Sequence, residues 1–339
     1  MKRLLVIFLF SILGRAYGQD MQYTQYYAAP LLLNPAFAGT SNDHRLILNY
    51  RNQWPSLPQG FTNYALSYDY NMSDYRSGVG FVVNVDNAGS ANLRSTNIQF
   101  MYAYKVQISD KWVFSPGLYF GYGQKSVDFN KLIFADQLQF DASGSAPTQD
   151  LSVSQNIQPE SHFDFGSGVL LYSEKVWIGV SSYHMNQPNQ SLLGEESRLP
   201  MKTSVHAGVR IPLYTGPFRR NQNSSIAPSF VYKKQGDFDQ LDIGLHFLYE
   251  PIIVGLWYRG IPLQQNVKDN ISQDAIALIL GMRLDFIDVG YSYDFTISEL
   301  GPTVGGAHEI SISYTFDVKT KKRMKRKDKF IPCPTFIRN

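Results

Sequence analysis

GGAHEISISYTF, residues 305–316, is the stretch of sequence that decides the fold. Its apolar residues fall on every second position from Ile310 to Phe316, and serine or threonine stands between them. A period of two is the pattern of a β-strand with one apolar and one polar face. The basic run that follows, VKTKKRMKRK (318–327), is too highly charged to be buried. The pattern therefore predicts a last strand that closes a β-structure and a basic tail after it.

The first eighteen residues have the composition of a secretory signal peptide. A basic start, Lys2-Arg3, precedes an apolar run over 4–13, and small residues at positions 16 and 18 suit cleavage before Gln19. A helix that spans a membrane needs about 20 apolar residues, so the short run disfavours an N-terminal membrane anchor. We expect the chain to be exported.

Alternation like that of the opening stretch recurs along the whole chain, and it predicts fourteen strands. The expected strands before the last one are 44–53, 61–71, 77–86, 93–108, 112–122, 160–172, 176–184, 201–213, 225–234, 240–249, 252–260, 273–284 and 287–297. Many have the length of about 9–11 residues that a tilted transmembrane strand needs.

The predicted connections alternate between long and short. Most odd ones are long or irregular, such as 123–159 and 185–200, whereas most even ones are tight, such as 173–175 and 250–251. Long loops at one end and short turns at the other are typical of bacterial outer-membrane barrels. The sequence thus predicts an all-β, 14-stranded antiparallel transmembrane barrel over 44–317, integral to the outer membrane and in contact with the lipid bilayer. An even number of strands predicts both termini on the short-turn, periplasmic side.

The apolar faces of the strands are rich in aromatic residues near strand ends. We expect these aromatics to form girdles at the two membrane interfaces: Trp54, Tyr70, Tyr104, Trp112, Tyr249, Trp257 and Phe316. A soluble sandwich or propeller would also alternate, but it gives no reason for this placement. The opposite faces carry Gly, Ser, Asn and Asp, which suit a polar lumen.

Two features bear on the inside of the barrel. The segment 19–43 contains prolines and small residues without alternation, and it could plug the lumen from the periplasmic side. Charged strand residues of both signs are expected to face inward, where they line a channel, offer a docking surface or form a salt-bridge lattice that fills the lumen: Arg51, Asp69, Lys105, Asp164, Arg210, Asp242, Arg283, Asp288 and Asp294.

Sequence motifs for chemistry are missing. The six histidines have no metal-type spacing with one another or with the single cysteine, Cys333. His308-Glu309 continues with Ile-Ser-Ile and so fails the HExxH pattern, and no G-x-S-x-G occurs. We therefore expect no catalytic residue, no metal and no cofactor. A barrel enzyme would need a serine, a histidine and an acid that converge at one rim.

Charge is divided unevenly along the chain, whose net charge is +3. Nine Lys and Arg residues and the acidic Asp328 lie in 318–339, a net charge of +8, while the barrel region is acidic. The overall balance therefore does not indicate nucleic-acid binding. The basic tail is interpreted either as a solvated end or as a contact for an acidic periplasmic partner, through Lys321, Lys322, Arg323, Lys325, Arg326 and Lys327.

Several motifs in order resemble the PorP/SprF family of outer-membrane proteins from the type IX secretion and gliding systems of the Bacteroidota. They are YTQYYAAPLLLNPAFAG (23–39), RNQWPSLP (51–58), GVGFVVNVDNAG (78–89), WIGVSSYHMNQP (177–188), WYRGIPL (257–263), YDFTISELG (293–301) and GAHEISISYTF (306–316). The resemblance covers nearly all of the chain after the signal. Ala307 departs from it, since the family more often has serine there.

The resemblance implies a non-enzymatic role in the outer membrane, paired with a large secreted adhesin that carries a type B C-terminal domain. Such proteins are thought to help secrete the adhesin or retain it at the surface. Some associate with the periplasmic ring lipoprotein and the peptidoglycan-binding protein of the machinery. A porin-like or FadL-like small-molecule channel is the alternative function.

The loops 54–60, 123–159 and 185–200 are the hypothesised grip on the adhesin, because aromatic and methionine anchors dominate protein interfaces. The candidate residues are Trp54, Phe129, Phe134, Phe140, Met185 and Leu193. The expected organisation is a signal peptide (1–18), an irregular segment (19–43), the barrel (44–317) and a basic periplasmic tail (318–339).

Overall fold

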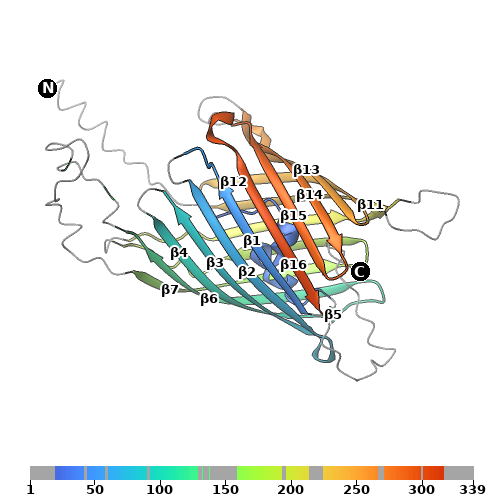
Figure 1. Ribbon diagram of the computed structural model, residues 1–339. Helices are drawn as coiled ribbons and strands as arrows, with labels where there is room; N and C mark the ends of the chain where they lie inside the picture. The colour runs from blue at the N-terminus through green and yellow to red at the C-terminus, as the bar shows by residue number, and fades with distance from the viewer. Residues whose placement is uncertain are drawn as a thin grey trace.

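The wall of the molecule is a closed antiparallel β-barrel of fourteen long strands in the computed structural model (Figure 1). The structure describes residues 20–41, 44–57, 60–89, 92–128, 132, 137, 159–192, 196–213, 224–265, 271–298 and 301–316. The first strand pairs with the last, from His44 opposite Phe316 to Gln53 opposite Ala307, and this pairing closes the ring. The predicted fold class and strand number are confirmed.

The strands agree with the expected ranges to within a few residues. Their bounds are β1 His44–Gln53, β2 Phe61–Met72, β3 Ser77–Ala88, β4 Leu93–Tyr104, β6 Val113–Ser126, β7 Glu160–Tyr172, β8 Val176–Tyr183, β9 Lys202–Val209, β11 Ser224–Gln235, β12 Phe238–Tyr249, β13 Ile252–Gln265, β14 Ile271–Leu284, β15 Ile287–Thr296 and β16 Ala307–Phe316. The two-residue strands β5 (Val106–Gln107) and β10 (Ile211–Pro212) continue β4 and β9 along the same neighbours, β6 and β11.

The two ends of the barrel differ in their connections. The short-turn end holds the start of β1, the end of β16 and tight turns such as those between β12 and β13 and between β14 and β15. The long-loop end holds the opposite strand tips, including the connection from β8 to β9 over 184–201. This asymmetry matches the pattern of outer-membrane barrels.

Alternation places one residue of each pair outside and the next inside. On β1, Leu48 is half exposed on the outer face, while its neighbour Ile47 is fully buried in the interior. One girdle prediction is wrong: Trp257 is only 3% exposed and faces inward. Leu256 occupies the outer face of β13 at that level, so the period of two puts Trp257 on the inner face.

Residues 20–41, called the lumen segment, run through the interior of the barrel. They form three short helical turns, η1 (Tyr26–Ala28), α2 (Pro30–Leu33) and η2 (Pro35–Phe37), seen in blue within the ring of strands in Figure 1. None of the helices in the described ranges is long and apolar enough to cross a membrane.

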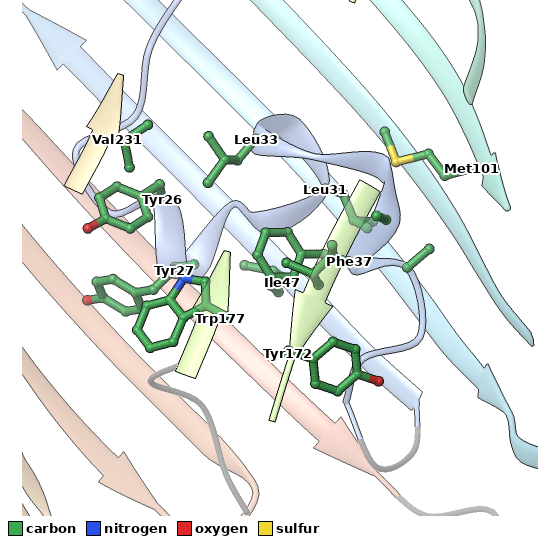
Figure 2. Packing of buried hydrophobic residues seen from close by; sticks show 14 of the residues in the cluster. Tyr26, Tyr27, Leu31, Leu33, Phe37, Ile47, Met101, Tyr172, Trp177 and Val231 are labelled. Carbon is green, nitrogen blue, oxygen red and sulfur yellow. The ribbon is translucent and has the colours of Figure 1, made fainter. Parts of the chain in front are cut away.

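An apolar core lies between the lumen segment and the inner face of the barrel. Figure 2 shows Leu31, Leu33 and Phe37 of the segment pointing among strand side chains. Their buried partners come from strands around the ring, and they include Ile47, Val82, Met101, Tyr119, Leu170, Trp177, Val231, Ile253 and Ile279. Two cavities beside the segment hold about 10 Å³ each, roughly the volume of one water-sized sphere. The described lumen is filled by the chain itself.

Two inward glycines let the backbone of the lumen segment approach the wall. A Cβ at Gly78 would collide with the carbonyl group of Ala38, and one at Gly117 would collide with the backbone of Ala36. Glycine is favoured where another backbone comes this close. The small residues of these strands therefore receive the segment.

Candidate functional site

The lumen segment crosses the barrel from end to end. Asp20 lies at the long-loop end, where its carboxylate accepts hydrogen bonds from His184 Nε2 (2.8 Å) and Lys202 Nζ (2.7 Å). Gly39, near the other end of the segment, donates its backbone N–H to Asp69 Oδ2 (3.0 Å) at the short-turn end.

This path bears on the prediction about the termini. The even strand count does place the start of β1 and the end of β16 at one end. The segment before β1 passes back through the lumen and brings Asp20 to the opposite end. Residues 1–19 and 317–339 lie outside the described residues, so the side on which the two termini lie stays a prediction.

The residues around Asp20 form what we call the Asp20 clamp: Asp20, Asp164, His184, Lys202 and Gln235. Gln235 Nε2 donates to Asp20 Oδ1 (3.2 Å), and Asp164 is joined to Asp20 through His184. His184 joins two carboxylates, Asp20 through Nε2 and Asp164 through Nδ1 (2.6 Å). Burial lowers the pKa of His184, but the two carboxylates outweigh it and raise the pKa to about 9. Burial likewise opposes ionisation of Asp20, yet His184 and Lys202 hold the pKa of Asp20 well below its usual range. The clamp therefore carries a charged imidazolium at neutral pH.

A second anchor uses backbone groups of the segment. The N–H groups of Thr24 and Gln25 donate to the two carboxylate oxygens of Glu309, at 2.8 and 2.9 Å. Arg51 pairs with the same carboxylate (3.1 Å) and with Asp294 (2.8 Å). All these charged side chains are at most 2% exposed. Each therefore needs its partner of opposite charge, because an unpaired buried charge destabilises the folded state.

The ion network extends around the wall from Asp294. Arg259 donates to Asp294 (3.0 Å), to Asp242 (3.1 Å) and to the hydroxyl of Thr24 (2.9 Å). Lys233 joins Asp242 (3.3 Å) to the side chain of Gln22 (3.0 Å). Three cations, Arg51, Arg259 and Lys233, face the buried anions Asp242, Asp294 and Glu309. A fourth anion, Asp274, is 48% exposed and lies 3.8 Å from Arg259. The network is a lattice of mixed charge that grips residues 22–25.

Asn34 is the third anchor. Its Nδ2 lies 3.1 Å from the carbonyl oxygen of Val169, 3.3 Å from that of Val180 and 3.1 Å from His206 Nε2. Its Oδ1 accepts the N–H of Ala36 (2.9 Å) and caps η2. One fully buried amide therefore ties the segment to β7, β8 and β9 and also starts its last turn.

The part of the lumen segment at the short-turn end of the barrel is held by charged strand residues. Arg45 forms a bidentate salt bridge with Asp69, with distances of 2.7 and 3.1 Å. Asp69 also accepts a hydrogen bond from the backbone N–H of Gly39. Lys105 donates to the carbonyl oxygen of Gly39 and to Asn71 Oδ1. Of the inward charges named from the sequence, Arg51, Asp69, Lys105, Asp164, Asp242 and Asp294 all contact the segment or its anchors. Arg283 pairs with Asp288 (3.2 Å) within the wall.

The candidate partner-binding residues are not gathered into one described patch. Trp54 follows β1, is half-buried and packs edge-on against Phe61 (5.4 Å between ring centroids). Met185 follows β8 at the same end and is 46% exposed. Between them stand β2, β3, β4, β6 and β7. Phe129, Phe134, Phe140, Leu193 and the six tail residues Lys321, Lys322, Arg323, Lys325, Arg326 and Lys327 lie outside the described residues.

Sequence reasoning missed the residues that anchor the lumen segment. Thr24, Gln25 and Asn34 stand among aromatic and aliphatic neighbours in YTQYY and LLLNPAF. A polar residue inside so apolar a run is a signal for a buried hydrogen-bonding role. Among the described residues, no group of three or more His, Cys, Asp or Glu side chains is arranged to hold a metal ion.

Comparison with known proteins agrees with this architecture. The family model described as type IX secretion system membrane protein PorP/SprF matches residues 16–314. No curated protein matches the sequence.

Among solved structures, the toluene transporter TodX of P. putida is similar with a TM-score of 0.50 and 11% identity, covering 88% of this chain and 95% of TodX. The toluene transporter TbuX of Ralstonia pickettii matches with a TM-score of 0.46 and 10% identity, covering 86% of this chain and 94% of TbuX. At 11% identity the likeness to TodX concerns the fold.

Proposed function

Because this chain belongs to the PorP/SprF family of type IX secretion system membrane proteins, we propose that it is a non-enzymatic accessory that binds a cognate surface adhesin. It would bind the type B C-terminal domain of that adhesin and help to secrete it or retain it at the cell surface. The observation that carries this proposal is the filled lumen. A barrel whose described interior is packed with its own residues 20–41 offers its rims and loops for binding.

The adhesin would be held at the long-loop end. Long loops of bacterial outer-membrane barrels face the outside, so we place Trp54, Met185 and the Asp20 clamp outward. Phe129, Phe134, Phe140 and Leu193 belong to the same proposed grip. The exposed side chain of Met185 adapts readily to partner surfaces.

Affinity purification from native membranes in mild detergent tests the proposal. We expect one large surface protein to co-purify with the wild-type chain. Shortening the connection between β6 and β7 by removing 130–157 should abolish co-purification while the barrel still migrates as a folded band without heating. A matched deletion of 215–222, at the other end of the barrel, should leave co-purification unchanged. Full recovery of the adhesin with the 130–157 deletion would overturn the proposed grip.

The basic tail would connect the barrel to the periplasmic machinery. Its candidate partners are the ring lipoprotein and the peptidoglycan-binding protein, which Lys321, Lys322, Arg323, Lys325, Arg326 and Lys327 would contact. A chain truncated after 318 should lose these partners in a pull-down and keep the adhesin. Equal recovery of the periplasmic partners would contradict a role for the tail.

The orientation of the two ends can be tested separately. A short epitope placed after residue 19 should be labelled by antibody on intact cells, because Asp20 lies at the long-loop end. The same epitope at the C-terminus should require permeabilised cells. Labelling of both only after permeabilisation would argue against the proposed orientation.

A small-molecule channel is the alternative function. TodX is described as a toluene transporter, but a channel here would require the lumen segment to leave the interior. Planar bilayers with the wild-type protein should show no steady conductance. Stable conductance of the wild-type chain would favour the channel.

A further inference from the structure

A group of polar side chains lies on the inner wall of the barrel beside the lumen segment. It consists of Ser313 on β16, Asn49 on β1, Ser67 on β2 and Gln99 on β4, and we call it the polar strip. Each of the four residues is at most 7% exposed. None of them belongs to the three anchors of the lumen segment, so their role is still to be explained.

Strand register brings these side chains together. Ser313 and Ser67 stand directly opposite Ile47, one on each side of it, and Asn49 follows two residues further along β1. Val82 stands between Ser67 and Gln99 in the same way. Neighbouring strands lie about 4.8 Å apart. Two members separated by one strand are therefore too far apart for a direct hydrogen bond, but they are in reach of bridging water molecules.

The polar atoms of the strip are not satisfied by protein groups. Among the described residues, no hydrogen-bond partner is found for the Oδ1 and Nδ2 atoms of Asn49, the Oγ atoms of Ser67 and Ser313, or Oε1 of Gln99. A buried polar group without a partner destabilises the fold, and ordered water commonly supplies the partner. The strip thus needs a small hydrogen-bonding ligand.

The part of the lumen segment that faces the strip is apolar. Ala29 and Leu32 of the segment pack with Ala65, which stands directly opposite Asn49. The side chain of Leu31 lies beside Gly80 on β3. Alanine and leucine side chains neither donate nor accept hydrogen bonds, so the segment covers the strip without pairing it.

The space at one end of the strip has the size of a single water molecule. Ser311, Ser313 and Tyr27 help to line a cavity of about 10 Å³ between the wall and the segment. A volume of about 10–15 Å³ is enough for one water, whereas truly empty cavities are apolar. This cavity therefore suits water and excludes larger solutes.

Polar residues continue the strip toward both ends of the barrel. Arg283 and Asp288 line the same cavity from the short-turn end, and their side chains are 10% and 17% exposed. At the long-loop end, Asn84 and Asp86 are half-buried on the inner face of β3. Hydrogen-bonding groups thus extend from one mouth of the lumen to the other.

We propose that the polar strip binds a file of ordered water molecules, which runs beside the lumen segment from the long-loop mouth to the cavity at Ser313. The carboxamide of Asn49 and the hydroxyl of Ser67 hold the middle of the file, since both groups donate and accept hydrogen bonds. The lumen segment stays in place, and its side that faces β16, β1 and β2 is hydrated.

Two matched isoleucines test this site. Ile47 is 1% exposed and stands between the unpaired hydroxyls of Ser67 and Ser313. Ile279 is fully buried and stands opposite Ser292, whose hydroxyl accepts a hydrogen bond from Gln25 (3.2 Å).

The measurement is side-chain oxidation of the full-length protein in mild detergent after a millisecond X-ray pulse, read by mass spectrometry. Radiolysis of a bound water produces a hydroxyl radical next to the side chain that the water touches. We expect Ile47 to be oxidised at least about fivefold faster than Ile279, because only Ile47 lies beside the proposed waters. Equally slow oxidation of the two isoleucines would overturn the proposal.

Three variants locate the water. Asn49→Leu and Ser67→Ala each remove polar atoms of the strip and should lower the oxidation of Ile47 at least about threefold. Ser292→Ala removes a buried inner serine outside the strip and should leave the oxidation of Ile47 unchanged. Each variant is first checked for the folded band without heating. Unchanged oxidation in both strip variants, or an equal loss in Ser292→Ala, would show that the strip does not hold the water.

Discussion

The two halves of the lumen segment are held by different forces. Residues 20–25 are fixed by charge, through the Asp20 clamp and the lattice around Glu309, whereas residues 30–37 are fixed mainly by apolar packing and the Asn34 amide. Beyond them, Asp69 and Lys105 hold Gly39. Buried ion pairs are directional, but removing one partner destabilises the fold because it leaves a buried charge unpaired. Apolar packing is less directional and roughly proportional to buried area. We infer that the directional ion pairs around residues 20–25 determine the position of the lumen segment, and that the apolar packing of residues 30–37 stabilises it in that position.

Removing Glu309 should have the largest effect on this comparison. Glu309→Leu leaves two backbone N–H groups and part of Arg51 unpaired in the interior. We expect a loss of about 4 kcal/mol in the free energy of unfolding, measured by urea titration in detergent. Tyr314→Leu, on the outer face of the same strand, should cost less than about 1 kcal/mol. Similar losses for the two variants would show that the lattice does not depend on Glu309.

Truncating Leu31 tests the apolar half. Leu31 is fully buried among inner-face side chains, so Leu31→Ala leaves a cavity and should cost about 3 kcal/mol. The loss should stay constant when salt is raised, since no charge is left unpaired. A marked salt dependence would contradict the division between the two halves.

Replacing Asn34, which joins the lumen segment to the barrel wall, should have a smaller effect on the free energy of unfolding. Asn34→Leu removes the donor to two strand carbonyl groups and the cap of η2, and we expect a loss of about 2 kcal/mol. Limited proteolysis should then cut within 35–41 before the barrel unfolds. Gln107→Leu, at an exposed position of β5, serves as the control. Unchanged proteolysis of the Asn34 variant would show that Asn34 does not anchor the lumen segment.

The smallest effect is expected from pH at the Asp20 clamp. The folded-state pKa of His184, about 9, exceeds its ordinary value near 6.5. The contribution of His184 to the stability of the folded state is therefore complete below about pH 6.5 and is lost as the pH rises through about 9. Hydrogen exchange at residues 20–22 should accelerate across that window, with little change at 30–37. His184→Gln should flatten the dependence, and an unchanged profile in that variant would exclude His184 as its source.

Local patterns predicted the wall well, because each strand carries its own period of two. Strands such as β12 and β15 could be placed from their own residues, and the mixed charges suggested an interior lattice. Trp257 was misplaced because aromatic residues suit both a membrane interface and a packed interior. Only the alternation with Leu256 and the contact with Tyr26, with ring centroids 4.8 Å apart, assign it to the inside.

The anchors of the lumen segment could not be predicted in the same way. Thr24 meets Glu309 across 285 positions of sequence, and Asn34 meets His206 across 172. Such pairs depend on how fourteen strands close and which side chains then face one another. A single sequence contains no local signal for that.

The sequence by itself determined a fourteen-stranded barrel with one apolar and one polar face, since the side-chain period and the lengths of the connections are local properties. Only the tertiary structure decided that residues 20–41 cross the lumen and bring Asp20 to the end opposite the start of β1. The direction of that crossing depends on burying the segment in a closed ring. The strand charges that hold it, Arg51, Arg259, Asp294 and Glu309, find their partners only when β1, β13, β15 and β16 stand around it.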